Sequence, residues 1–198
     1  MKTHNKSDHF KKVKKFVIDA FGQNDANTIH LLRTVDWVLH LKPNATEALL
    51  IAAVSHDIGR SSKLNKENLT PVDMPLEQFM KYHQETSAAI MENYLTQIGV
   101  PQSIIQRVKE LISKHETGGD EDQNLLKDAD SLSFLETKID HFLNEQVQKM
   151  GIEVVREKFD WMFRRIDSKV AKKFALPLYD DAMKKVHERM KIASIKPD

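Results

Sequence analysis

The spacing of apolar and polar residues along the chain predicts a series of amphipathic helices. Over 8–21 and again over 26–41, apolar side chains recur every three or four positions, which places them on one face of an α-helix. Gly22 and Pro43 follow these two stretches, and both residue types commonly end helices. The same pattern predicts further helices at 76–98 with a break near Tyr82, at 101–115, at 125–150, at 152–174 and at 177–192.

The segment 45–58 differs because it is apolar almost all round, and a helix of this kind is expected in the middle of a domain. Asn44 and Glu47 resemble a capping box, with Asn44 as the N-cap and Glu47 at the third helical position. The segment ends in Ser55-His56-Asp57-Ile58-Gly59, so polar groups stand at the end of the most buried element. Loops are expected at 60–75, which contains two prolines, and at 116–124.

Composition favours an all-α fold in a single domain spanning 1–198. The 198 residues include only six Gly and six Pro, which is few for a β-rich fold with its many turns. The absence of cysteine excludes disulfides, cysteine-ligated zinc and thiol nucleophiles. A formal net charge of +1 argues against a dedicated nucleic-acid binder. Because no apolar run has the length of a membrane span or the place of a signal peptide, we expect a cytoplasmic protein without a membrane partner.

His56 and Asp57 are the first candidates for chemistry. They stand at the carboxyl end of the buried segment, where polar side chains need strong partners, and a divalent metal is a partner that imidazole and carboxylate share. The alternative is a helix C-cap pair in which the helix dipole favours a positively charged histidine. Further candidates stand beside apolar positions of other predicted helices: His30, His83, His115, Asp128 and Asp130.

At these positions the sequence resembles the HD-domain superfamily of metal-dependent phosphohydrolases. The resemblance rests on an ordered series: His30 followed by Arg33 and Val35, then Ala52-Ala-Val-Ser-His-Asp-Ile-Gly-Arg60, then Lys127-Asp-Ala-Asp-Ser-Leu132. It covers about residues 26–140 and implies an HD-type helical bundle, which the helices within 152–192 complete. It also implies a four-residue metal signature: His30, His56, Asp57 and Asp130. Asp130 matches better than Asp128, because the family's ligand precedes a polar residue and then Leu.

Two further histidines extend the resemblance. HD-domain branches with two metals insert two additional His between the His-Asp pair and the final Asp, and His83 and His115 stand in that interval. In those branches Asp57 would bridge both metals, while His83 and His115 would bind the second. The run His115-Glu-Thr-Gly118, followed by Lys127-Asp-Ala-Asp130, is similar to the symmetrical dinucleoside-tetraphosphatase branch.

Several neighbouring residues have two interpretations each. Arg60 and Lys63 follow the His-Asp pair and could receive a substrate phosphate or be solvated loop cations. Arg33 could contact phosphate or form a structural ion pair. Glu116 and Glu85, close to the additional histidines, could orient ligands or accept protons. The candidates for direct roles in catalysis are Asp57, Arg60 and Glu116.

The function implied by the resemblance is a metal-dependent phosphohydrolase or phosphodiesterase. It would act on a nucleotide or another small phosphate ester, through hydroxide that the metal generates from water. The ligand types suit one or two divalent ions of Mn, Fe, Co, Ni or Zn, with Mg also allowed. Two alternatives stay open: a mixed-valent di-iron oxygenase, as in myo-inositol oxygenase, and a non-catalytic ligand-sensing HD module. Specificity is expected to come from the 60–80 loop and the last two helices, where no motif identifies the substrate.

Overall fold

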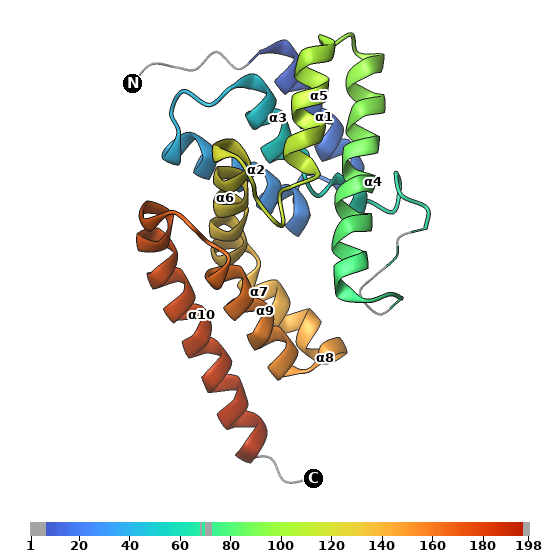
Figure 1. The fold of residues 1–198 in the computed structure, drawn as a ribbon. Coiled ribbons are helices and arrows are strands. Elements are labelled where there is room, and N and C mark those ends of the chain that lie inside the picture. The colour runs from blue at the N-terminus through green and yellow to red at the C-terminus, as the bar shows by residue number, and fades with distance from the viewer. Residues whose placement is uncertain (1–6, 68, 70–72, 196–198) are drawn as a thin grey trace.

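The computed structural model describes residues 7–67, 69 and 73–195. Within these ranges every regular element is a helix, as the sequence predicts (Figure 1). Part of the predicted 60–75 loop, namely residues 68 and 70–72 with Pro71, lies outside the described residues. The elements in chain order are α1 (Asp8–Phe21), α2 (Ala26–Leu41), α3 (Glu47–Ser55), the 3-10 helix η1 (Ile58–Arg60), α4 (Leu76–Gln97), α5 (Gln102–Ile112), α6 (Glu121–Thr137), α7 (Ile139–His141), the π-helical turn η2 (Phe142–Gln146), α8 (Val147–Met150), α9 (Ile152–Arg164) and α10 (Lys169–Ile195).

Helix α3 is the buried centre of one half of the molecule. All eight of its residues from 48 to 55 are buried, and α1, α2 and α5 pack around it. The all-round apolar sequence of this segment is therefore explained by contacts on every side. Because His56 and Asp57 follow α3 directly, the chain places them, still buried, beside Asp130 of α6 and His83 of α4.

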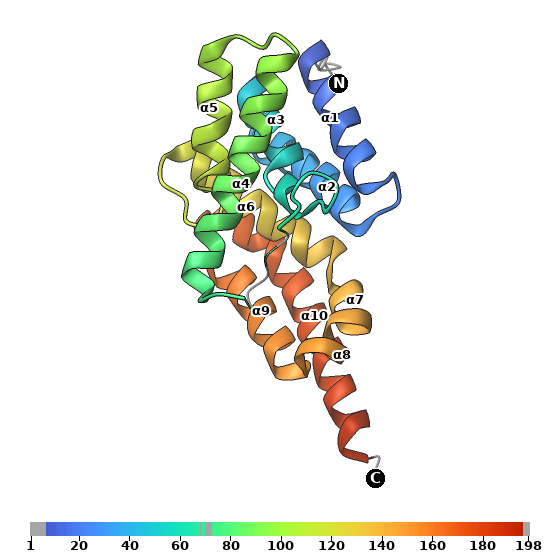
Figure 2. The ribbon, with the colours of Figure 1, turned by 90° about the vertical axis from the view of Figure 1, so that its right-hand side faces the viewer.

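Helix α6 joins the two halves of the fold. On one side it packs against α2 and α3, and on the other against α9 and α10. Helices α7 to α10 form the end of the molecule that carries the C-terminus (Figure 2). Fully buried residues such as Phe159 on α9 and Val186 on α10 lie on the inner faces of these two helices. No helix in the described part of the chain is both long and apolar enough to cross a membrane.

The capping box predicted before α3 is wrong in its register. Thr46, not Asn44, is the N-cap, because its side chain accepts a hydrogen bond from the backbone N–H of Leu49 at 3.3 Å. Glu47 is therefore the first helical residue rather than the third. The α-helix also stops at Ser55, three residues before the predicted end, and η1 tightens the chain after Asp57.

The boundary between the last two helices was also predicted in the wrong place. The break falls at 165–168 rather than at 175–176, and Pro177 lies inside α10. The reason is a contact with α6: the Asp128 carboxylate accepts hydrogen bonds of 2.9 Å from the N–H groups of Asp167 and Ser168. Ser168 Oγ in turn accepts from backbone N–H groups in the first turn of α10. Side-chain caps thus start α10 ahead of Pro177, which withholds only its own N–H donor.

Other predicted helix limits also differ from the structure. Helix α4 runs without the break expected near Tyr82. Helix α5 ends at Ile112, so His115 stands in the following turn rather than on the helix. Helix α6 begins at Glu121 inside the expected acidic loop, because Asp120 and Gln123 form a capping box there. The helical region that follows is interrupted at Lys138.

The packing around α3 predicts a large effect of truncation. Replacing the fully buried Ile51 with alanine is expected to lower the free energy of unfolding by about 2–5 kcal/mol, because the substitution leaves a cavity in a closely packed core. Ile29→Ala is the matched control, since Ile29 is 47% exposed on α2. Urea unfolding followed by circular dichroism measures both changes. Equal losses in the two variants would contradict the central position of α3.

Candidate metal centre

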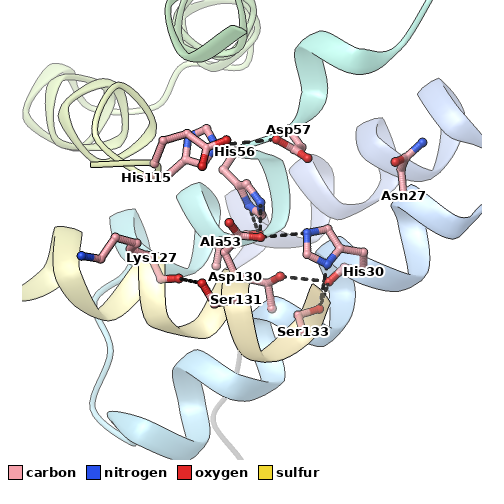
Figure 3. Close-up of polar contacts among 12 residues, drawn as sticks. Asn27, His30, Ala53, His56, Asp57, His115, Lys127, Asp130, Ser131 and Ser133 are labelled. Carbon is pink, nitrogen blue, oxygen red and sulfur yellow. Dashed lines mark hydrogen bonds and ion pairs between the residues drawn. The ribbon is translucent and has the colours of Figure 1, made fainter. Parts of the chain in front are cut away.

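The six side chains predicted as metal ligands meet beyond the carboxyl end of α3, and Figure 3 labels all of them except His83. They come from five different segments and are all buried: His30 from α2, His56 and Asp57 from the α3–η1 junction, His83 from α4, His115 from the turn after α5, and Asp130 from α6. Burying this many polar groups together requires strong compensating interactions. The sequence separation of these residues shows that the fold itself assembles the cluster.

One group consists of His30, His56 and Asp130. Asp130 Oδ1 lies 3.0 Å from Nε2 of His30 and 3.3 Å from Nε2 of His56. The two imidazole rings meet edge to face with their centroids 5.5 Å apart. Ligand atoms from all three residues lie within 4.8 Å of one another, which is close enough for a single ion to reach all of them.

A second set of contacts surrounds Asp57. Its Oδ1 atom lies 2.5 Å from Nε2 of His83 and 3.6 Å from Nε2 of His115. Asp57 groups with His56 and His115, while His83 and His115 group with Glu116, in each case with ligand atoms within 4.8 Å. His56 therefore stands between the two aspartates, and Glu116 joins the residues at the His83 and His115 side.

The orientation of His56 and His115 is set by backbone carbonyl groups. Nδ1 of His56 lies 3.1 Å from the carbonyl oxygen of Ala53, and Nδ1 of His115 lies 2.8 Å from that of Ile112. A carbonyl oxygen can only accept, so in each ring Nδ1 carries the hydrogen. The lone pair of the neutral ring is then on Nε2, which faces the carboxylates.

His30 is oriented in the same sense by α6. The Ser133 hydroxyl donates to the carbonyl oxygen of His30 at 2.7 Å, so it accepts from Nδ1 of the same residue at 3.0 Å. Three imidazoles thus turn Nε2 toward carboxylate oxygens, an arrangement that a positive charge between them stabilises. Nε2 of His56 is buried and forms no hydrogen bond with any described residue. This donor set of imidazoles and carboxylates fits a divalent transition metal.

The environment keeps two of these imidazoles neutral. Burial lowers the pKa of His115 to about 4, although Glu116 opposes the shift. Burial also lowers the pKa of His30 against the opposing effect of Asp130. For His56 burial acts in the same direction, but the carboxylates of Asp130 and Asp57 outweigh it and raise the pKa. An imidazole binds metal only in its neutral form, so His30 and His115 need no deprotonation and His56 would release a proton.

Each aspartate uses its second oxygen to bind an arginine. Arg60 Nε donates to Asp57 Oδ2 at 2.7 Å. Arg165, which caps the carboxyl end of α9, forms ion pairs with Asp130 Oδ2 and with Glu116, and its Nε donates to the Ser131 hydroxyl at 2.7 Å. Both carboxylates are therefore held with one oxygen toward the histidines and the other toward a guanidinium.

These arginines keep the buried carboxylates ionised. Burial alone would raise the pKa of each acid, but Arg60 and His83 outweigh it for Asp57, whose pKa falls well below its usual value. Arg165 and His56 have the same effect on the pKa of Asp130. Arg165 and His115 lower the pKa of Glu116 to about 2. A carboxylate of such low basicity is a poor proton acceptor near neutral pH, so its environment suits Glu116 to orienting or binding roles.

Comparison with known proteins places the chain in a family. A family model described as a domain of unknown function, DUF4202, matches residues 4–186. The chain belongs to the DUF4202 family. No curated protein matches it.

Two solved structures share the fold of this DUF4202 protein. One is a predicted HD superfamily hydrolase from an uncultured Thermotogales bacterium, with 22% sequence identity, a TM-score of 0.56 and 92% of each chain covered. The other is YpgQ from Bacillus subtilis in complex with ADP, with 15% identity, a TM-score of 0.53, and 92% of this chain and 96% of YpgQ covered. These likenesses confirm the predicted all-α fold of the HD type.

Three basic side chains near the centre of the DUF4202 protein were not predicted: Lys138, Lys158 and Arg165. No motif includes them, and the packing of α9 against α6 brings Arg165 to Asp130 across 35 positions of sequence. One feature of the sequence could have identified Lys158 and Arg165 as inward-facing. The positions 155, 158, 162 and 165 follow helical spacing, and Val155 and Met162 are buried, so Lys158 and Arg165 share the inward face of this segment.

Three other predicted residues lie apart from the cluster. Of the two roles considered for Arg33, the structure shows the structural ion pair, because its Nε donates to Glu136 at 2.6 Å. Lys63 donates at 2.9 Å to the backbone carbonyl oxygen of Asp19 on the exposed surface. Glu85 is exposed and faces Lys81 on the same helix.

Proposed function

We propose that this protein is a metal-dependent phosphohydrolase or phosphodiesterase acting on a nucleotide or another small phosphate ester. The observation that carries the proposal is the set of three imidazoles, each anchored through Nδ1, that turn Nε2 toward buried carboxylates. Among the three Nε2 atoms, that of His56 is the clearest case, because it is buried and forms no hydrogen bond with any described residue. A metal ion would use this nitrogen together with Nε2 of His30 and Oδ1 of Asp130, because the three atoms lie within 4.8 Å of one another.

The protein's own residues prepare such a site in three ways. The carbonyl groups and Ser133 fix the ring orientations, and Arg60 and Arg165 keep Asp57 and Asp130 ionised. A divalent metal bound there would lower the pKa of water enough to supply hydroxide near neutral pH and would neutralise phosphate oxygens. The protein would not need a serine or cysteine nucleophile.

Arg60 is the residue best placed to contact the substrate phosphate from the η1 side. Its side chain is 39% exposed, and among the described residues only its Nε is engaged, with Asp57. A guanidinium has five N–H donors in a planar fork, so the remaining donors can bind phosphate oxygens. YpgQ, which shares the fold, was solved in complex with ADP, and this supports nucleotides as the first substrates to test.

Metal analysis of the purified protein, followed by a screen of nucleotides and phosphate esters with Mn, Co, Ni and Mg, tests the proposal. We expect bound transition metal at one or two ions per chain and release of phosphate or a nucleotide product. Bound metal with turnover only in the presence of O₂, together with di-iron optical and EPR signals, would instead support the oxygenase alternative. Absence of metal binding would contradict the proposal.

The choice of Asp130 over Asp128 leads to a prediction. Asp130→Asn is expected to lose most of the bound metal, because its Oδ1 faces both His30 and His56. Asp128→Asn is the matched control, because the Asp128 carboxylate is turned toward the start of α10. This variant should retain its metal, and the weakened helix cap should lower the free energy of unfolding by about 0.5–2 kcal/mol. Metal content and thermal unfolding measure the two effects. The reverse order would make Asp128 the ligand.

A further inference from the structure

Lys158 on α9 carries an ammonium group for which the described residues provide no anionic partner. Its Nζ lies 4.2 Å from the ring centroid of Trp161 and 5.6 Å from that of Phe134. These cation–π contacts are its only close polar interactions with the described part of the chain, where it forms neither a hydrogen bond nor an ion pair. The two aromatic rings hold the ammonium in place without using any of its three N–H donors.

This ammonium group lies at the candidate metal centre. Its Nζ and the guanidinium of Arg165 both lie near the ring of Trp161, at 4.2 and 4.6 Å from the ring centroid, and Arg165 pairs directly with Glu116 and Asp130. Burial lowers the pKa of Lys158 to about 8 in spite of the favourable effect of Glu116. A partly buried cation without an acceptor costs free energy, and this cost falls when an anion binds beside it.

The other cations of the centre are already engaged. Each of the three guanidinium nitrogens of Arg165 already has a partner, in Ser131, Glu116 and Asp130. Lys138, which is 7% exposed, donates to Asn27 Oδ1 at 2.8 Å.

The balance of charge at the centre favours an anionic ligand. The cationic side chains Arg60, Lys158 and Arg165 equal in number the carboxylates of Asp57, Glu116 and Asp130, so the charges of these six side chains cancel. Bound metal would add further positive charge. The ammonium of Lys158 is the member of this set with all its donors available.

We propose that Lys158, which contacts the rings of Trp161 and Phe134, binds a phosphate group of the ligand on the side of the centre formed by α9. The inference rests on the proposed function for the identity of the ligand as a phosphate compound. It adds that the recognition of this ligand depends on the C-terminal part of the chain. Arg60 and Lys158 would then contact phosphate oxygens from η1 and α9 respectively, with Glu116 and Asp130 between them.

Calorimetric binding of inorganic pyrophosphate to the full-length protein tests this role, with and without added Mn²⁺. Lys158→Met removes the charge but keeps the length of the side chain, and we expect about ten- to a hundredfold weaker binding. Lys158→Arg restores a cation and should bind within severalfold of the unsubstituted protein. Lys149→Met, at an exposed lysine of α8, is the matched control and should leave the affinity unchanged.

Metal content measured on the same samples separates this inference from the proposed function. Weaker pyrophosphate binding by Lys158→Met in both arms, with unchanged metal content and thermal unfolding, supports the phosphate role. Equal affinity of Lys158→Met and the unsubstituted protein would overturn it, and so would a lack of pyrophosphate binding by the unsubstituted protein. In either case, metal bound to the protein would still support the proposed metal centre. A protein that binds no metal would contradict that centre, whatever the result with pyrophosphate.

Discussion

Asp57→Ala is expected to abolish metal retention and to lower hydrolysis by several orders of magnitude. Asp57 Oδ1 faces Nε2 of both His83 and His115, so the substitution removes the carboxylate nearest to two candidate ligands. It also leaves Arg60 without its 2.7 Å partner beside the site. Metal content by mass spectrometry and initial rates with the best substrate of the screen measure the two losses.

Two comparisons make this result specific. Asp57→Asn keeps the shape of the side chain and should lose metal while the protein stays folded, as judged by thermal unfolding. Asp36→Ala on α2 is the matched control, because its carboxylate is exposed and lies away from the cluster beside Arg33. If a variant at position 57 retains both the metal and the normal rate, Asp57 is only a structural cap between α3 and η1.

Replacing His83 and His115 together with alanine is expected to lower the metal content from two ions per chain to one and to reduce activity by orders of magnitude. The two histidines group with Glu116, whereas the group of His30, His56 and Asp130 contains neither of them. One set of ligands therefore stays intact in the double variant. Metal content per chain, measured after removal of loosely bound ions, checks the number directly.

The matched control for this pair replaces His141 and His187, which lie outside the cluster, with alanine. That double variant should keep the full metal content and rate. A single ion in the unsubstituted protein, with no change in the double variant of His83 and His115, would leave a mononuclear centre. The two histidines could then serve as hydrogen-bond donors to a bound phosphate.

The sequence predicted the parts of the site that depend on order along the chain. The apolar run before His56 predicted a buried helix, and the resemblance of the series His30, His56, Asp57 and Asp130 to the HD-domain superfamily implied that their segments meet. The structure brings all four together, because the helices that carry them pack directly against one another.

The parts that escaped prediction depend on contacts between distant segments. Arg165 acquires its place only when α9 packs against α6, and in the sequence it is one of many cations on amphipathic helices. The start of α10 was missed for the same reason, because Asp128 fixes it from another helix and overrides the local signal of Pro177. The N-cap at Thr46 was missed because N-cap preferences rank asparagine above threonine, so the local signal favoured Asn44.

Anomalous diffraction from crystals grown in Mn²⁺ tests the central claim most directly. We expect an anomalous peak within bonding distance of Nε2 of His30, Nε2 of His56 and Oδ1 of Asp130. Nδ1 of His30 should still bond to Ser133, and Nδ1 of His56 to the Ala53 carbonyl oxygen. A map with no peak at these atoms, or with peaks only at exposed carboxylates elsewhere on the molecule, would contradict it.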